Sequence, residues 1–367
     1  MSKVFIVSNP IPDSNKSSLI SLSKFSLLLS CIFGKLMVLG GNIEDFDDNA
    51  CVELYNVRCS RTGNKLRKVL SFLKLELLLL SMILKRVERD DLAFFWIADK
   101  MLLPFWAAKL KRARTYYFLM GNVGNEGKKT LFRNISEKMI VYMAEHADYI
   151  CVESLSVIDC WNIRIKPEKI KIIHLFVEGK AEPLYEQKEN TIGMVCRLVE
   201  GKHVLESIKA FAMFSNQKPN WKLQIVGSGM LRDDCENLIK EFKLEHKVEL
   251  LGWVEHSKLP SIVAKWKLLL FPTDAEGLPN GLIETMFQGV PAIASPVGGI
   301  IDVIEDWVNG WILSDCSVDS ICEAMIRALS SQNFLSIAKA AEKIIVQKFT
   351  FSASVDNLRE QLKEVLL

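Results

Sequence analysis

The chain has 367 residues, of which 49% are hydrophobic and 25% are charged, and this composition favours a globular protein with two domains of ordinary size. Its nine cysteines are scattered and form no CxxC pair, which indicates a reducing compartment and argues against a disulfide framework or a structural zinc site. Residues 1–177 carry 26 Lys and Arg against 18 Asp and Glu, whereas residues 178–367 carry 20 against 26, so the first half is expected to meet something anionic, either a membrane surface or a phosphate-bearing substrate.

The first half begins with a strand, a helix and a second strand. The apolar run at 4–8 predicts a buried strand, and leucines and phenylalanines at helical spacing predict a helix over 17–33. Residues 35–39, closed by two glycines, predict the second strand. The amino terminus runs straight into the first strand and has no secretory pattern. Further along, the same criteria predict a helix at 135–147 and strands at 148–152 and 170–175.

The stretch between these elements is unusually apolar. Residues 66–84 are leucine-rich, but Lys74 and Glu76 interrupt them, and no run reaches the about 20 apolar residues that a membrane-spanning helix requires. Residues 101–106 combine bulky apolar side chains with a basic run that follows, Lys109, Lys111, Arg112 and Arg114. This composition is typical of a helix lying in a membrane interface. A helix whose apolar face packs on the sheet remains the alternative.

Two polar segments of the first half are interpreted as loops. Residues 121–129 contain three glycines and two lysines, but the spacing is not GxxxxGK[ST], so a loop facing the cleft between domains is favoured over a phosphate site. Within it Asn122, Asn125 or Glu126 could face an acceptor. The acidic residues at 45–47 are interpreted as a loop and not as a metal site.

The second half follows a polar linker at 178–190 and alternates regularly between strands and helices. The expected strands lie at 191–196, 221–226, 248–251, 268–271 and 292–295. The expected helices lie at 204–214, 231–242, 258–265, around Glu284 and Met286, and at 320–329, 334–348 and 352–367. This alternation predicts an open parallel sheet covered on both faces.

Charged residues and glycines gather after the predicted strands. Arg197 and Lys202 are two cations just before a helix, a combination suited to a diphosphate. Gly227 would let a ligand approach the backbone. Glu276 lies in the loop after 268–271, and Glu284 lies eight positions later, about two helical turns on, so both carboxylates can reach one crevice.

The start of that helix and the two carboxylates complete the candidate site. The residues leading into the helix offer unpaired backbone amides to phosphate or sugar oxygens; they are Gly277, Leu278, Pro279 and Asn280. A carboxylate such as Glu284 accepts two hydrogen bonds from a vicinal diol such as a ribose, and Glu276 can do the same for sugar hydroxyls. The set fits a nucleoside diphosphate sugar.

From about residue 191 to 313 the chain resembles the donor-binding domain of the retaining glycosyltransferases of family 4, also called glycosyl transferases group 1. The motifs that carry this resemblance are RLVEGK at 197–202, IVGSG at 225–229, LLGWV at 250–254, EGLPNGLIE at 276–284 and GVPAIASPVGG at 289–299. The resemblance implies the α/β GT-B fold, with two facing Rossmann-like domains of parallel sheets and a C-terminal helix that returns toward the first domain. The implied boundaries are 1–177 for the acceptor-side domain, 178–190 for the linker, 191–345 for the nucleotide-sugar domain and 346–367 for the helix.

The resemblance also implies roles for the site residues. Arg197 and Lys202 would hold the diphosphate and offset the charge of the leaving group, and together with Glu276, near the reacting face of the sugar, they would form the catalytic set. Glu284 would bind the ribose, and the backbone at 277–280 would touch the donor. Transfer would proceed with retention and without a metal or another cofactor, because Arg and Lys supply the positive charge.

These features predict a hexosyltransferase of polysaccharide biosynthesis that uses a UDP-sugar or GDP-sugar donor and a glycan or lipid-linked acceptor. We expect it in the cytoplasm, peripheral on the inner face of the membrane, and without a nucleic-acid partner. The loop at 9–18 has no glycine, and the histidines of the first half, His146 and His174, do not stand where the family often has one. A catalytically weak assembly subunit that binds nucleotide sugar is therefore one alternative, and a nucleotide-sugar epimerase is another.

Overall fold

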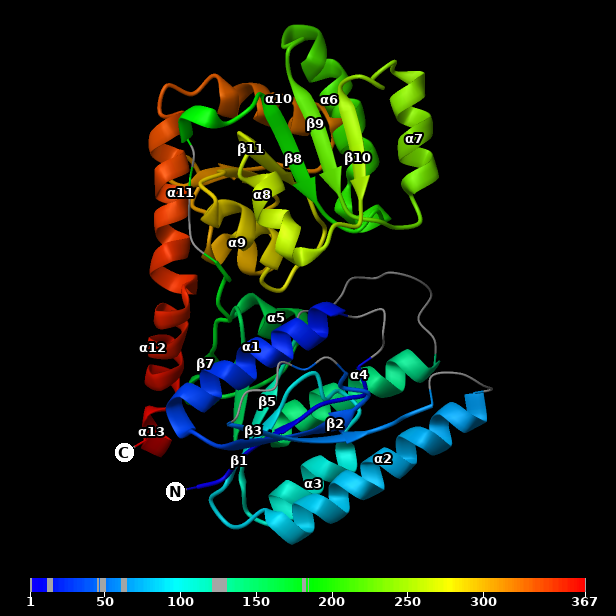
Figure 1. Cartoon of the computed structure of the whole chain (residues 1–367), viewed down its shortest axis with the longest axis vertical. Helices are drawn as coiled ribbons and strands as arrows, with labels where there is room; N and C mark the ends of the chain where they lie inside the picture. The colour runs from blue at the N-terminus through cyan, green and yellow to red at the C-terminus, as the bar shows by residue number, and fades with distance from the viewer. Residues whose placement is uncertain are drawn as a thin grey trace. The chain divides into compact units, whose positions relative to one another are not determined.

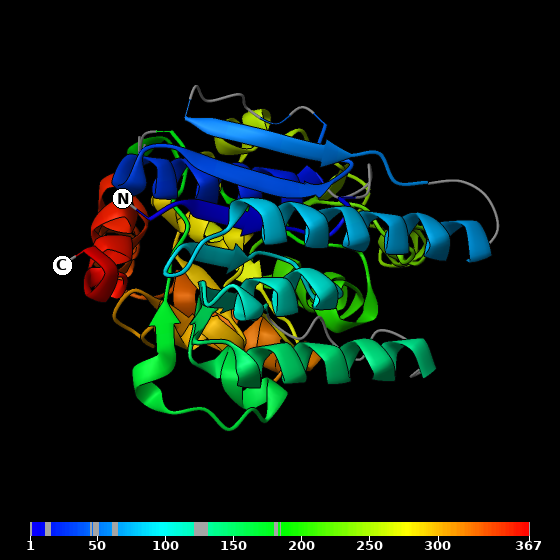
Figure 2. The same ribbon diagram turned by 90° about the horizontal axis from the view of Figure 1, so that it is seen from below.

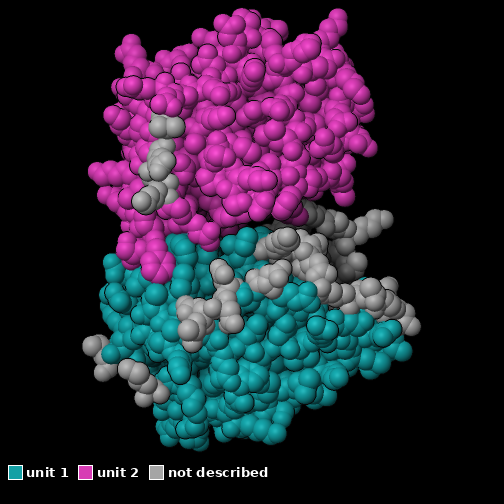
Figure 3. Space-filling model, viewed as in Figure 1, with its two compact units in different colours: residues 1–120, 127–176, 354–367 teal, residues 121–126, 177–353 magenta. Residues whose placement is uncertain are grey.

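A computed structural model describes residues 2–11, 16–44, 46, 51–60, 65–120, 131–179, 183 and 185–366. The chain divides into two compact units (Figure 3). Unit 1 comprises residues 1–120, 127–176 and 354–367, and unit 2 comprises residues 121–126 and 177–353. The predicted loop at 121–129, with its candidate acceptor residues, lies outside the described residues, as do Asp45, Asp47 and residues 12–15 of the first loop.

In the described part of unit 1, seven parallel strands form one sheet in the order β3-β2-β1-β4-β5-β6-β7 (Figure 1). The strands are β1 (Val4–Val7), β2 (Leu36–Gly41), β3 (Val52–Val57), β4 (Leu92–Phe95), β5 (Arg114–Phe118), β6 (Tyr149–Val152) and β7 (Ile170–Ile172). The strand order reverses between β1 and β4, which is the switch point of a doubly wound sheet.

Helices cover both faces of this sheet. They are α1 (Lys16–Phe33), α2 (Lys65–Arg86), α3 (Leu102–Leu110), α4 (Leu131–His146), α5 (Ser156–Trp161), α12 (Phe351–Gln361) and α13 (Lys363–Leu366), with a 3₁₀ turn η1 (Pro167–Lys169). Successive strand residues point to opposite faces, so Phe5 and Val7 pack with α2, α3 and α4, which lie side by side (Figure 2). Val4 and Ile6 pack with α1 and α12. Because both faces are covered, all four residues of β1 are buried.

The chain from residue 354 onward belongs to unit 1. Leu358 of α12 is fully buried in the same apolar cluster as α1. Two side chains of α12 also cap backbone groups at the edge of the sheet. The Gln361 Oε1 accepts a hydrogen bond from the Ile172 amide at 3.1 Å, and the Asn357 Oδ1 accepts one from the His174 amide at 3.2 Å. Helix α12 therefore packs on the sheet that contains β1 and satisfies backbone amides at the edge of that sheet.

The sheet of unit 2 has the order β10-β9-β8-β11-β12-β13, with every pair parallel. Its strands are β8 (Thr191–Val195), β9 (Lys222–Val226), β10 (Val248–Gly252), β11 (Leu268–Phe271), β12 (Ala292–Ala294) and β13 (Gly310–Ile312). Its helices are α6 (Val204–Gln217), α7 (Arg232–Glu241), α8 (Leu259–Val263), α9 (Asn280–Phe287), α10 (Val318–Leu329) and α11 (Phe334–Phe349), and its 3₁₀ turns are η2 (Tyr185–Gln187), η3 (Glu200–Lys202), η4 (His256–Lys258) and η5 (Gly298–Asp302). Leu268 and Leu270 of β11 face α6 and α10, whereas Leu269 and Phe271 face α8, α9 and α11.

The fold class predicted from the sequence is confirmed, and the main omissions lie in unit 1. Strands β4 and β5 were not predicted; β4 precedes the segment 101–114 and β5 begins at its last residue, Arg114. Strand β3 is an edge strand whose residues are only half-buried or exposed, so its sequence lacks the apolar run of a central strand. No helix among the described residues is long and apolar enough to cross a membrane.

One half-buried carboxyl of unit 1 makes stability depend on pH. Burial raises the pKa of Glu153, which follows β6, to about 7. Between about pH 4.5 and 7 the folded protein keeps a proton that the unfolded chain releases, so the free energy of unfolding falls as the pH rises. We expect Glu153→Gln to flatten this slope and to stabilise the protein at pH 8 by about 1–3 kcal/mol. Urea unfolding at several pH values measures it, with exposed Glu145→Gln as control; equal slopes in both variants would contradict the assignment.

Candidate functional site

The candidate site lies in unit 2, where two loops leave the carboxyl ends of neighbouring strands. One loop, residues 196–203, follows β8, and the other, residues 272–279, follows β11. Strands β8 and β11 are paired side by side, and the strand order of the sheet reverses between them. Open parallel sheets bind their ligands at such a switch point. The fold therefore brings the two predicted loops to one place.

The ammonium group of Lys202 and the carboxylate of Glu276 meet across these loops. Lys202 Nζ donates hydrogen bonds to Glu276 Oε1 and, at 3.0 Å, to Thr273 Oγ1. The two charged side chains are only 13% and 18% exposed, so water screens their attraction less than it would at the surface. Arg197, in the same loop as Lys202, is exposed. Three of the predicted charged residues thus stand on two adjoining loops.

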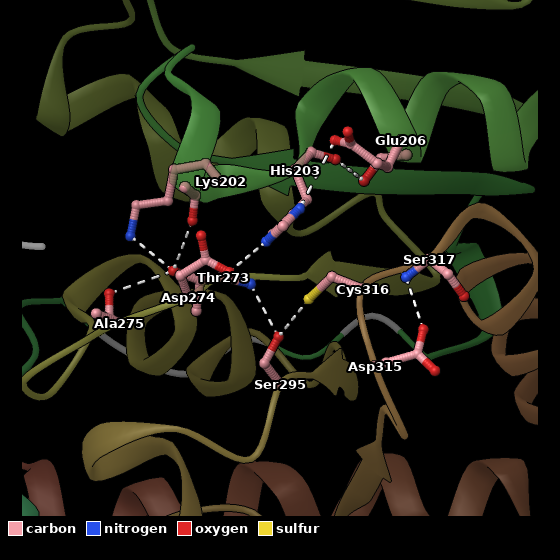
Figure 4. A network of polar contacts seen from close by, with 12 residues as sticks. Lys202, His203, Glu206, Thr273, Asp274, Ala275, Ser295, Asp315, Cys316 and Ser317 are labelled. Carbon is pink, nitrogen blue, oxygen red and sulfur yellow. Dashed lines mark hydrogen bonds and ion pairs between the residues drawn. The ribbon is translucent and has the colours of Figure 1, made fainter. Parts of the chain in front are cut away.

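Further polar contacts join the two loops to each other and to Ser295, which follows β12 (Figure 4). His203 Nε2 lies 2.6 Å from Asp274 Oδ1, and the Asp274 amide donates to the Gly201 carbonyl at 3.0 Å. The Thr273 amide donates to Ser295 Oγ at 2.9 Å. Sequence reasoning did not single out His203, Asp274 or Ser295, because each is a common surface residue type and its contact is distant in sequence. These contacts preform the site and lower the ordering cost of binding a ligand.

At two glycines the backbone of these loops comes so close that no side chain would fit. Gly227 has a φ of +137°, and a Cβ there would lie 1.8 Å from the Cys196 carbonyl oxygen. Gly298 has a φ of +56°, and its Cβ would lie 1.8 Å from the Glu276 carbonyl oxygen. Only glycine accommodates such an approach. The atoms that approach Gly227 most closely are therefore backbone atoms of Cys196.

Glu284 makes a different contact from that of Glu276. It lies on α9, which begins after Pro279, and the residues leading into this helix are partly or fully buried up to Pro279. His256 Nε2, from turn η4, lies 2.8 Å from Glu284 Oε1, and the Glu284 side chain is 16% exposed. The two predicted carboxylates thus have different partners: Glu276 contacts Lys202, and Glu284 contacts His256.

A cavity of about 250 Å³ opens beside Glu284 and His256. It is lined by Val177, Glu178, Gly179, His256, Ser257, Leu259, Pro260, Val263, Glu284 and Gln288. Its lining combines the carboxylates of Glu178 and Glu284 and the imidazole of His256 with apolar side chains. Such a combination suits a small molecule that has both a polar ring with hydroxyl groups and a flat apolar part.

Other chemistries are poorly supported at this site. Burial raises the pKa of the Cys196 thiol to about 12, so it stays protonated and is a weak nucleophile. Within the described ranges, no three His, Cys, Asp or Glu side chains gather in a way that could hold a metal ion. The groups on hand are cations, hydrogen-bond donors and carboxylates, which suit an anionic, hydroxyl-rich ligand.

Comparison with known proteins finds its sequence matches in this half of the chain. Residues 178–345 match the family "Glycosyl transferases group 1". Over 181 residues the chain is 30% identical to an uncharacterized glycosyltransferase of Methanocaldococcus jannaschii, covering 49% of this chain and 45% of the relative. Over 170 residues it is 26% identical to the UDP-Gal:alpha-D-GlcNAc-diphosphoundecaprenol alpha-1,3-galactosyltransferase of Escherichia coli, covering 46% and 43%. The match thus spans less than half the length of each relative.

A solved structure shares the fold over the whole chain. HepE of Anabaena, solved in complex with UDP and glucose, has a TM-score of 0.75 at 18% identity, and the match covers 99% of this chain and 100% of that one. At this identity the likeness establishes the architecture, which agrees with the two parallel sheets. Residues 178–345 are therefore similar to the glycosyl transferases group 1 family, in a chain that has the GT-B fold.

Proposed function

We propose that the protein is a retaining glycosyltransferase of family 4. It transfers a hexose from a UDP-sugar or GDP-sugar to a glycan or lipid-linked acceptor of polysaccharide biosynthesis, at the cytoplasmic face of the membrane. The observation that carries the proposal is the meeting of Lys202 and Glu276 at the switch point, in the same domain as the cavity beside Glu284. The names of the Escherichia coli relative and of the HepE complex, which mention UDP-Gal and UDP, support a nucleotide-sugar donor.

Lys202 and Arg197 would hold the diphosphate. When the bond between the sugar and the diphosphate breaks, negative charge grows on the leaving oxygen, and a fixed ammonium group stabilises that charge. Both positive charges come from the chain, so the proposed reaction needs no metal and no cofactor besides the donor. The ammonium group of Lys202 forms an ion pair with the Glu276 carboxylate. A diphosphate would compete for the ammonium group and release the Glu276 carboxylate toward the hydroxyls of the transferred sugar.

Glu284 would bind the ribose hydroxyls, and the apolar side chains of the cavity would face the base. The backbone at Gly277–Asn280 would contribute amide donors to the diphosphate or the sugar. Leu278 and Pro279 are buried, so their side chains would position the loop while its amides face the donor; Pro279 itself has no amide hydrogen. Gly227 would act in the same indirect way, by letting its loop pack against residue 196.

A ligand panel tests the proposal. A nucleotide that binds only the folded protein raises the Tm of the protein by mass action. In a panel of UDP, GDP, ADP and their nucleotide sugars, we expect UDP or GDP and the matching nucleotide sugars to raise the Tm. Release of nucleoside diphosphate from the selected donor then measures turnover. Tight nucleotide binding with no turnover of any nucleotide sugar would contradict the enzymatic proposal and favour an assembly subunit.

His256 is expected to matter for nucleotide affinity although the sequence did not suggest it. Replacing His256 by Ala removes a hydrogen-bond donor that orients Glu284, so we expect the Kd for the bound nucleoside diphosphate to rise about 3- to 10-fold. His256→Gln keeps a donor and should retain most of the affinity. Isothermal titration measures both, with exposed His246→Ala as the control, and an unchanged Kd in His256→Ala would refute the role.

A further inference from the structure

Helix α2 carries an apolar stripe that faces solvent. Leu66, Leu70, Leu73 and Leu77 recur at intervals of four and three residues and are 65%, 56%, 44% and 56% exposed, and Leu84 is 38% exposed. At about 100° per residue, these five side chains lie within about 40° of one line along the helix. A helix of a globular protein normally buries such a stripe.

The stripe is not the side of α2 that packs on the sheet. Leu75, Leu79 and Ile83 are buried against the core of unit 1. The carboxylate of Glu76 points toward α3, where it accepts a hydrogen bond from the Leu103 amide at 3.1 Å. Helix α2 therefore has two apolar faces, and among the residues that the structure describes only one of them is buried.

Basic residues border the stripe. Arg67, Lys74 and Lys85 are exposed, and by the helical repeat they form a row about 80–100° from the leucine line. The helix carries six Lys and Arg, and its single acidic residue, Glu76, is buried. The solvent side of α2 thus combines leucines with positive charge, which is the composition of helices that lie in the interface of an anionic bilayer.

Helices α3 and α4, which lie beside α2 in the same layer (Figure 2), also expose apolar side chains. Trp106 and Leu110 of α3 are 41% and 75% exposed, and Tyr142 of α4 is 38% exposed. The rings of Trp106 and Tyr142 lie 6.0 Å apart between centroids. Trp and Tyr are favoured at the level of lipid headgroups because their rings are both apolar and polar.

The segment predicted to meet the membrane contributes only part of this surface. Met101, Pro104 and Phe105 are buried, and Lys109 Nζ is bonded to Asp148 Oδ1 at 2.8 Å. Most of the exposed apolar side chains thus lie on α2 and not on residues 101–114. We call the set Leu66, Leu70, Leu73, Leu77, Leu84, Trp106 and Leu110 the leucine face.

We propose that the leucine face docks on an anionic lipid surface, with α2 lying in the plane of the interface. A second copy of the chain fits less well, because a two-fold contact would place the basic rows of both copies in one interface. Anionic headgroups instead complement them. This inference rests on the proposed function in one respect: a lipid-linked acceptor would be presented at that surface.

Vesicle flotation of the full chain tests the proposal. We expect binding to vesicles that contain phosphatidylglycerol and weak binding to pure phosphatidylcholine vesicles. Combined L66Q, L70Q, L73Q and L77Q should lower the bound fraction at least about tenfold, because the apolar anchor is lost. Combined R67Q, K74Q and K85Q should weaken binding only to the anionic vesicles and reduce its sensitivity to salt.

The control is a variant in which four exposed apolar residues of unit 2 are replaced. It combines M213Q, F242Q, L335Q and V346Q and should float like the parent. Nucleotide binding and donor hydrolysis, both measured without vesicles, should be unchanged in the leucine variant and show that it is folded. Vesicle binding that survives the leucine changes would overturn the proposal, as would a dimer of the parent that the leucine changes dissociate. A parent that floats but binds no nucleotide would instead overturn the proposed function alone.

Discussion

Replacing Lys202 by Ala is expected to lower the kcat of the proposed transfer about 100- to 1000-fold. This is the usual cost of removing one fixed donor from the negative charge that develops in a transition state. Lys202 is held for this task by Thr273 and Glu276, and its side chain is only 13% exposed. Release of nucleoside diphosphate under saturating donor measures the loss.

The Lys202 experiment has two controls. Lys209→Ala removes an exposed lysine of the neighbouring helix α6 and should keep parental kcat, and Lys202→Arg keeps the positive charge and should retain part of the activity. Because the Lys202 change also leaves Glu276 without its ammonium partner, Glu276→Gln should be tested alongside it. A Lys202→Ala variant with kcat within about threefold of the parent would exclude charge stabilisation by this residue.

Replacing Glu284 by Ala is expected to raise the Kd for the bound nucleoside diphosphate about 10- to 100-fold. Hydrogen bonds to a charged group contribute about 1.5–3 kcal/mol, and the carboxylate would accept them from the ribose. The parent should also bind 2′-deoxynucleoside diphosphates less tightly than their ribose forms. The variant should lose that discrimination, since the group that distinguishes the two sugars is gone.

The ribose and 2′-deoxyribose forms of the nucleoside diphosphate are each titrated into the parent and into Glu284→Ala. The four affinities from isothermal titration form a double-mutant cycle that isolates the ribose contact. Glu323→Ala, an exposed glutamate of helix α10, is the matched control and should keep both affinities. If Glu284→Ala still prefers ribose to deoxyribose by the parental factor, the carboxylate does not read the ribose. The contact with His256 would then be purely structural.

The strands of unit 2 were largely predictable because a parallel sheet covered on both faces makes each strand an apolar run. Residues 268–271, for example, were expected as a strand and form β11, all four of them buried. Strand β3 could not be recognised in this way, since its residues are partly exposed at the edge of the sheet. The secondary structure of the second half was thus easier to predict from the sequence than that of the first half.

The candidate site was predictable in its residue types and only partly in its contacts. Lys202 and Glu276 are 74 positions apart, and they meet because β8 and β11 are neighbours at the switch point. The order of strands in the sheet decides this, and no local pattern encodes it. His256 carries no sequence signal, because a single histidine in a polar turn is usually a surface residue.

By itself the sequence determined the class of fold, the two loops of the candidate site and the absence of a long apolar span from residues 66–84. It also showed that α2 is rich in leucine, but not which leucines would be buried. Leu75 and Leu79 pack on the sheet, whereas Leu73 and Leu77 face solvent. Only the tertiary structure decided between these faces. A helix that is apolar on both sides has no preferred orientation until its neighbours α3 and the sheet cover one of them.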